Sequence, residues 1–271
     1  MMTKLYWNKV RHMDTTLITY EQPLNEHIRL CLRLEQLFTA LHYHLKDSSS
    51  HGSRLAVETL LKIVDVADRP DLKTKLLQTL TQQAAALSQL EQAPQVDRQK
   101  LHEILHNLDR LIDALHHNNA TKMGETLRQH PFLKQIRLQL YNPAGVCNFN
   151  VPAFALWLHQ PDSKRANDLN EWIQGFALLE EIISTILSLT RDSSPTQNVT
   201  ANNVFYQQTM DPSLQWQMVR IIVKTEFSVY PEISVGKHRL SIRFKSLTND
   251  PVNNWHVLEE SLPFLLSCCR I

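Results

Sequence analysis

The segment Arg239-Leu240-Ser241-Ile242-Arg243-Phe244-Lys245 alternates charged or polar residues with apolar ones over its whole length. A period of two is typical of a β-strand, in which successive side chains point to opposite faces. Leu240, Ile242 and Phe244 are therefore predicted to face a core. From Pro23 to Thr190, in contrast, apolar residues recur at the spacing of amphipathic helices. This change of period predicts an α+β fold, with an N-terminal all-helical domain and a smaller antiparallel β domain.

Prolines and capping residues divide the helical half of the chain. One helix is predicted to stop before Arg69-Pro70, because proline disfavours the helical conformation of the residue before it. Asp71 and Asp97 are positioned to be N-caps, and Pro94 separates the two helices that they begin. The polar run Asp47 to Ser53 is predicted to end the first helix. The predicted helices contain residues 30–45, 57–64, 76–87, 101–115, 132–140, 154–157 and 169–187.

Three segments outside the helices set the predicted domain boundaries. Thr15 to Tyr20 is strand-like but stands alone before the helical block, so we expect it to pair with the C-terminal sheet. Leu214 to Lys224 is rich in Trp, Val and Ile and is also predicted to be a strand. Asp192 to Thr200 is polar, contains a proline and is predicted to be a linker or a domain edge. The predicted domains are a helical domain, 22–192, and a β domain, 14–21 with 198–271, after a disordered leader or alternative start over 1–13.

The composition excludes several classes of protein. The chain has 271 residues but only five glycines, which are far apart, so the clustered glycines of phosphate-binding loops are missing. A formal net charge of +1 argues against a protein that coats nucleic acid or an anionic membrane. The four cysteines are too few for a disulfide scaffold, and no apolar run approaches the roughly 18–20 residues of a membrane span. We expect a cytoplasmic protein with no cofactor, no nucleic-acid partner and no membrane insertion.

The segment His102-Glu103-Ile104-Leu105-His106 matches the zinc-binding pattern H-E-x-x-H. On a helix both imidazoles would share one face, with the glutamate as the catalytic base. However, Asp109 stands where longer zinc-protease motifs have glycine, and both histidines fall on the polar flank of the predicted helix. We interpret the segment as a solvated helix face and expect no metal site and no catalytic residue, with a zinc-dependent hydrolase as the alternative.

A basic strip lies on the outward face of the alternating strand that ends at Lys245. Like charges at this spacing repel one another, so we expect either solvent or an acidic partner to offset the repulsion. One explanation is a solvated face whose charges discourage edge pairing, and the other is a docking strip for an acidic peptide. Arg29 and Arg33 repeat the basic pattern one turn apart on the first helix. The residues of the strip are Lys237, Arg239, Arg243 and Lys245.

Four blocks of sequence, in order along the chain, carry a family resemblance. They are Tyr20–Glu26 with Arg29 and Leu32–Glu35, then Asn142–Pro152 with Leu156–Leu158, then Tyr230–Ser234 with Lys237–Arg239 and Ile242–Phe244, and finally Cys268-Cys269. Together these blocks resemble the bacterial cell-division protein ZapD family.

The resemblance implies a homodimer that is not an enzyme. Proteins of this family bind the C-terminal tail of FtsZ and cross-link its filaments, so the expected partner is FtsZ and the expected location is the midcell division ring. A helical adaptor for another acidic partner stays open as an alternative. The basic residues expected to bind the tail are Arg29, Arg33, Arg69, Arg137, Lys237, Arg239, Arg243 and Lys245.

Overall fold

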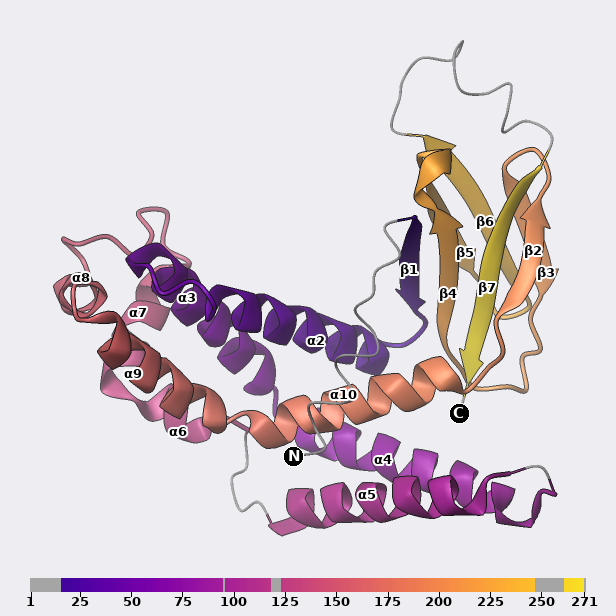
Figure 1. Cartoon of the computed structure of the whole chain (residues 1–271), viewed down its shortest axis with the longest axis horizontal. Coiled ribbons are helices and arrows are strands. Elements are labelled where there is room, and N and C mark those ends of the chain that lie inside the picture. The colour runs from indigo at the N-terminus through magenta and orange to yellow at the C-terminus, as the bar shows by residue number, and fades with distance from the viewer. Residues whose placement is uncertain (1–15, 95, 118–122, 247–260, 271) are drawn as a thin grey trace. The chain divides into compact units, whose positions relative to one another are not determined.

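A computed structural model describes residues 16–94, 96–117, 123–246 and 261–270 (Figure 1). The chain divides into two compact units, and the divisions fall after Ile28 and after Leu189. We call Arg29–Leu189 the helical unit and the rest of the described chain the β unit. The expected leader, 1–13, lies outside the described residues.

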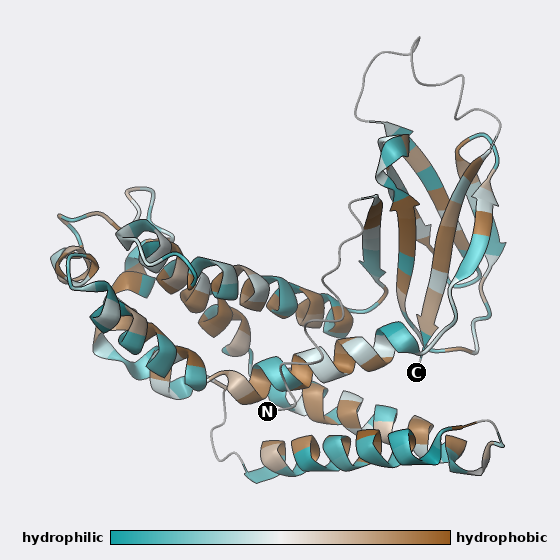
Figure 2. Ribbon diagram, in the orientation of Figure 1, coloured by the Kyte–Doolittle hydropathy of each residue, from teal (hydrophilic) through white to brown (hydrophobic). Residues whose placement is uncertain are grey.

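The helical unit follows the predicted order of helices, with extra short ones, but the single helix predicted over 169–187 is wrong. The chain forms two helices there, one ending at Gln174 and the next beginning at Ala177, because the helix breaks at Gly175 and Phe176 with a 60° bend. The chain forms α2 (Glu26–His44), α3 (Ser50–Ala67), α4 (Leu72–Ser88), a short 3-10 helix (Gln89–Gln92), α5 (Arg98–His117), α6 (Glu125–Gln129), α7 (Pro131–Leu140), α8 (Pro152–Leu158), α9 (Asp162–Gln174) and α10 (Ala177–Asp192). Figure 2 shows their amphipathic character, because hydrophobic and hydrophilic residues occupy different sides of a helix such as α5. Leu101, Leu108 and Leu111 of α5 are buried, as the sequence pattern predicts.

The predicted helix boundaries are confirmed in part. Helix α3 ends at Ala67, before Arg69-Pro70, and the Asp97 carboxylate caps α5 by accepting a 3.1 Å hydrogen bond from the Lys100 N–H. Asp71 is the N-cap residue of α4, as predicted, but its side chain makes no capping hydrogen bond and instead pairs with Lys75 at 2.5 Å. The polar run Asp47 to Ser53 does separate two helices, but its last residues already belong to the first turn of α3.

An aromatic cluster fills the core between α7, α8 and α9. The Phe154 and Trp157 rings are stacked with centroids 5.8 Å apart, and the Trp157 and Trp172 centroids are 5.7 Å apart. Trp157 also donates a 2.9 Å hydrogen bond from Nε1 to the carboxylate of Asp168. Both tryptophans are buried, which confirms that they are core residues.

A guanidinium is buried close to this cluster. Arg165 of α9 is only 7% exposed. Its Nε donates to the Ser53 hydroxyl at 3.0 Å, and its terminal nitrogens donate to the backbone carbonyls of Ser48, Leu158 and Gln160. Arg165 therefore links the turn before α3 to the turn that joins α8 and α9.

No single helix among the described residues is long and apolar enough to cross a membrane. Helices α9 and α10 meet that criterion only when taken as a pair, with a 60° bend between them. The apolar side chains of α10, including Leu179, Ile182 and Ile186, are buried within the protein.

The β unit contains two antiparallel sheets, whereas the sequence predicts one small sheet. The strands are β1 (Leu17–Pro23), β2 (Gln197–Ala201), β3 (Phe205–Thr209), β4 (Trp216–Lys224), β5 (Val229–Val235), β6 (Arg239–Ser246) and β7 (Leu262–Arg270). One sheet has the order β1-β4-β7-β2 and the other β3-β6-β5 (Figure 1). Their inner faces share one core, in which the Phe244 and Phe264 rings meet edge to face at 5.0 Å. The β unit is therefore a small sandwich.

Strand β1 pairs with the C-terminal sheet, as predicted. It lies antiparallel to β4, with Leu17 opposite Lys224 and Pro23 opposite Met218. On its outer face, Glu21 accepts hydrogen bonds of 2.7–2.8 Å from Arg191 and Arg220. An edge strand from the start of the chain is thus tied by both backbone pairing and charge to residues about two hundred positions away.

The predicted linker Asp192 to Thr200 is wrong in its second half. Residues from Gln197 onward form β2, which pairs with β7 along Val199 and its neighbours. The strand is short and lies at the edge of its sheet, so only Val199 and Ala201 turn inward while the alternate positions are polar and exposed. Two inward residues are too few to give a recognisable period.

Candidate functional site

The basic strip lies on β6, the central strand of the three-stranded sheet. Leu240, Ile242 and Phe244 are at most 1% exposed, and the alternation predicted from the sequence is confirmed. Arg239 and Arg243 are exposed on the opposite face. Because β3 and β5 form the edges of this sheet, the charges on β6 do not protect an edge, and that part of the first explanation is wrong. A solvated face stays open as an alternative to a docking strip.

The charges of the strip are offset only at one end. Lys245 pairs with Glu232 of β5 at 2.6 Å, and this contact raises the pKa of the ammonium. The Arg243 guanidinium lies over the ring of Phe205 on β3, 5.8 Å from its centroid, where a cation–π contact is favourable. Neither Arg239 nor Arg243 forms an ion pair with another residue of the described chain. The strip therefore presents two exposed guanidinium groups that form no ion pair among the described residues, although Glu232 lies opposite Arg243 in the strand register.

A shallow hollow of about 470 Å³ lies at the Arg239 end of the strip. It is lined by Ser234, Gly236, His238, Arg239 and Ser241. These residues belong to the hairpin that joins β5 to β6. Lys237 lies in the turn of this hairpin rather than on the strand, because β6 begins at Arg239.

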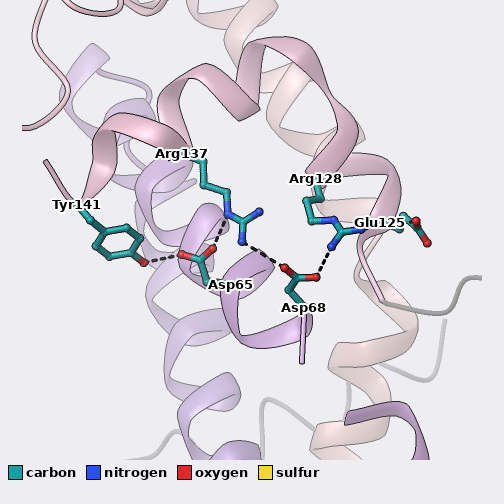
Figure 3. A network of polar contacts seen from close by, with 6 residues as sticks. All are labelled: Asp65, Asp68, Glu125, Arg128, Arg137 and Tyr141. Carbon is teal, nitrogen blue, oxygen red and sulfur yellow. Dashed lines mark hydrogen bonds and ion pairs between the residues drawn. The ribbon is translucent and has the colours of Figure 1, made fainter. Parts of the chain in front are cut away.

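Four of the predicted basic residues belong to the helical unit. Arg29 and Arg33 are exposed on α2, and Arg69 is exposed in the turn between α3 and α4. Arg137 is different, because it is half-buried and pairs with Asp65 at 2.5 Å and with Asp68 at 3.5 Å (Figure 3). Two carboxylates thus compensate the charge of Arg137 within the protein.

Asp65 and Asp68 hold a larger polar network together. Asp68 also pairs with Arg128 of α6, and the Tyr141 hydroxyl donates a 2.5 Å hydrogen bond to Asp65 (Figure 3). Burial and this hydrogen bond raise the pKa of Tyr141 to about 12, against the opposing positive charges of Arg137 and Arg33. Arg33 and Arg137 are therefore neighbours of one exposed tyrosine. The end of α3 anchors α6 and α7 through this network.

The eight predicted residues are thus divided equally between the units. Arg29, Arg33, Arg69 and Arg137 belong to the helical unit, and Lys237, Arg239, Arg243 and Lys245 belong to the β unit. Within the β unit, the four basic residues belong to one hairpin, β5–β6, so their charges lie close together. Sequence reasoning missed Asp65 and Asp68, because their partners lie 60–72 positions away and no local period signals such pairs.

The zinc-like motif lies on the exposed face of α5. His102 and His106 are exposed, while Leu101 and Leu108 of the same helix are buried. Within the described ranges, no group of three or more His, Cys, Asp or Glu side chains is arranged to hold a metal ion. Glu125 of α6, an acidic residue that follows the motif in the sequence, is directed to Arg128 at 3.6 Å.

The adjacent cysteines lie on β7. Cys269 is buried, and burial raises its pKa to about 11. Burial also raises the pKa of Cys268, which contacts the Gln208 amide at 3.2 Å. Burial thus disfavours the thiolate form of both side chains, and Cys269 packs in the interior of the β unit.

The fold and the exposed strip together define a class: a two-unit α+β protein with a surface of arginine and aromatic side chains, a composition common at protein–protein interfaces. A family profile described as "ZapD: Cell division protein" matches residues 32–243. "Cell division protein ZapD" of Coxiella burnetii (strain RSA 331 / Henzerling II) is 49% identical over 96% of this chain and all of its own length.

More distant relatives carry the same name. The protein of Cupriavidus necator is 33% identical over 94% of this chain and 100% of its own length. That of Methylococcus capsulatus is 32% identical over 94% of this chain and 98% of its own. The chain belongs to the ZapD family of cell division proteins. It therefore has a role in cell division, and its relatives are named as division proteins rather than as enzymes.

Proposed function

We propose that this protein binds the C-terminal tail of FtsZ on the outer face of β6 and, as a homodimer, cross-links FtsZ filaments at the division ring in the cytoplasm. The observation that carries the proposal is the pair Arg239 and Arg243, which are exposed on a central strand and have no ion-pair partner among the described residues. Membership in a family of cell division proteins supports a partner from the division machinery.

The chemistry of the strip suits a peptide that is both acidic and apolar. A guanidinium can donate two parallel hydrogen bonds to a carboxylate, which a lysine ammonium cannot do with the same geometry. Phe205, 38% exposed beside Arg243, offers an apolar surface next to the charge. In this proposal charge attracts the tail, and contact with the aromatic ring and the arginine stems retains it.

Cross-linking requires two such surfaces in one particle. A two-fold symmetric dimer presents two identical sites, and each can hold a tail from a different filament. Once one tail is bound, the second binding event has a raised effective concentration, so modest single-site affinity is sufficient. Arg29, Arg33 and Arg69 of the helical unit are proposed as additional contacts. Arg137 is proposed to act through its position in the network, because its charge is already engaged.

The proposal predicts the effect of charge reversal on the strip. Arg239→Glu with Arg243→Glu replaces both guanidinium groups with carboxylates that repel an acidic tail. We expect the double variant to lose more than about tenfold in co-sedimentation with FtsZ filaments, because charge-assisted hydrogen bonds contribute about 1.5–3 kcal/mol each. Pelleting with polymerised FtsZ measures the effect, and circular dichroism checks the fold.

The matched control is Arg98→Glu with Lys100→Glu. Both residues are exposed in the first turn of α5, and the change in net charge is the same. Acidic side chains are favourable at a helix N-terminus, so folding is expected to be preserved. Normal pelleting by the control and loss by the β6 variant supports the proposal. Equal pelleting by the β6 variant and the unmodified protein would refute it.

A further inference from the structure

The hollow at the β5–β6 hairpin is lined by residues whose hydrogen-bond donors have no acceptor among the described residues. Ser234 and Ser241 are directly opposite each other in the strand register, on the same outward face as Arg239. Their hydroxyls make no hydrogen bond to another residue of the described chain, and neither does the guanidinium of Arg239. His238 also lines the hollow. Residues that carry one guanidinium, two hydroxyls and one imidazole thus line a single hollow.

The backbone holds this arrangement in place without a ligand. The Gly236 N–H donates to the Arg239 carbonyl at 2.8 Å, which closes the hairpin. The Met210 N–H, just past the end of β3, donates to the His238 carbonyl at 2.9 Å, so the turn is also tied to the neighbouring strand. A preorganised site loses less conformational entropy when a ligand binds.

The charge near the hollow is positive. Lys237 and Arg239 lie at this end of the hairpin, whereas Glu232, which is opposite Arg243 in the strand register and two positions from Ser234, pairs with Lys245. A carboxylate group matches both this charge and the donors, because it can accept from the guanidinium and from both hydroxyls at once.

We infer that the hollow formed by Ser234, Gly236, His238, Arg239 and Ser241 is a carboxylate-binding site that receives one carboxylate of the acidic peptide bound along β6. This inference rests on the proposed function, which it extends from a basic face to a defined contact point. A peptide offers two sources of that carboxylate, the C-terminal α-carboxylate and an acidic side chain.

A peptide titration tests the inference with the full chain. Synthetic FtsZ tail peptide, prepared as the free acid and as the C-terminal amide, is titrated into the unmodified protein and into Ser234→Ala/Ser241→Ala by calorimetry. Both serines face outward, so their replacement leaves the sandwich core intact. Thr200→Ala, which removes an exposed strand hydroxyl from the other sheet, is the control.

We expect the double serine variant to bind the free acid about tenfold more weakly than the unmodified protein, and the control to bind normally. If the hollow takes the α-carboxylate, amidation weakens binding to the unmodified protein by a similar factor and causes no further loss in the variant. If amidation has no effect while the variant still loses affinity, the hollow takes an acidic side chain.

Full affinity of the double serine variant for the free acid overturns the inference and leaves the proposed function standing. Failure of the unmodified protein to bind either peptide refutes the proposed function, and the inference is then refuted with it.

Discussion

At the scale of single residues, the buried side chain of Arg165 is expected to contribute strongly to the stability of the folded state. Its guanidinium is buried, and the acceptors found for it are a hydroxyl and backbone carbonyls rather than a carboxylate. We predict that Arg165→Met lowers the free energy of unfolding by about 3 kcal/mol, because the buried carbonyls lose their donor. Urea denaturation followed by circular dichroism measures the change.

The neighbouring Lys164→Met is the control for this prediction. Lys164 is 60% exposed and pairs with Asp168 at 2.7 Å on the surface, so its loss is expected to leave the urea midpoint nearly unchanged. An unchanged urea midpoint for Arg165→Met would contradict the structural role of the buried guanidinium.

Residue-level prediction from the sequence succeeds where a local pattern is sufficient. The inward positions of β6 and the cap at Asp97 depend on neighbours in sequence, and both are confirmed. Arg137 is predicted from its charge alone, and the structure places it between Asp65 and Asp68. Its partners are about seventy positions distant, which periodicity cannot reveal.

At the scale of elements, the attachment of β1 depends on Glu21. Burial raises the pKa of this carboxyl, but hydrogen bonds and positive charge from Arg191 and Arg220 outweigh burial and lower the pKa below its ordinary value of 4.5. The folded state therefore holds a proton less readily than the unfolded state. The resulting stabilisation is present above about pH 4.5 and is lost as the pH falls through the lowered pKa.

We predict that Glu21→Gln lowers the free energy of unfolding by about 2 kcal/mol at pH 7 and that this difference shrinks at pH values below 4.5. Urea denaturation of both proteins at a series of pH values measures it. Glu226→Gln, which removes an exposed carboxylate paired with Lys224, is expected to cost less than about 1 kcal/mol at any pH. A constant difference between Glu21→Gln and the unmodified protein at all pH values would contradict the assignment.

Four strands, β2, β3, β5 and β7, are not predicted from the sequence, and two of them, β2 and β3, are missed for a common physical reason. Strands β2 and β3 lie at sheet edges, and their exposed positions are polar or mixed, as in the run from Phe205 to Thr209. Their strand conformation comes from pairing with β7 and β6, not from their own composition. By contrast, β1 and β4 are apolar enough to be predicted directly, and the pairing inferred for β1 is confirmed.

At the scale of the whole molecule, function should depend on ionic strength. If charge draws the FtsZ tail to β6, co-sedimentation with FtsZ should fall steeply as salt rises past about 0.15 M, where the screening length is about 8 Å. Pelleting over a salt series measures this, with FtsZ polymer and the dimer each assayed alone at every salt concentration. Salt-independent pelleting would contradict electrostatic capture.

The order of the strands also has a consequence for synthesis of the chain. Strand β7, residues 262–270, lies between β4 and β2 in its sheet. Strand β1 can pair with β4 only after β4 has been synthesised, some two hundred positions later. The helical unit is continuous in sequence and can fold while it leaves the ribosome. At about 5–20 residues per second, β1 is exposed for roughly ten seconds or more before its partner emerges. A nascent chain therefore carries an unpaired edge strand that a chaperone, or a neighbouring chain on the same messenger, can capture first.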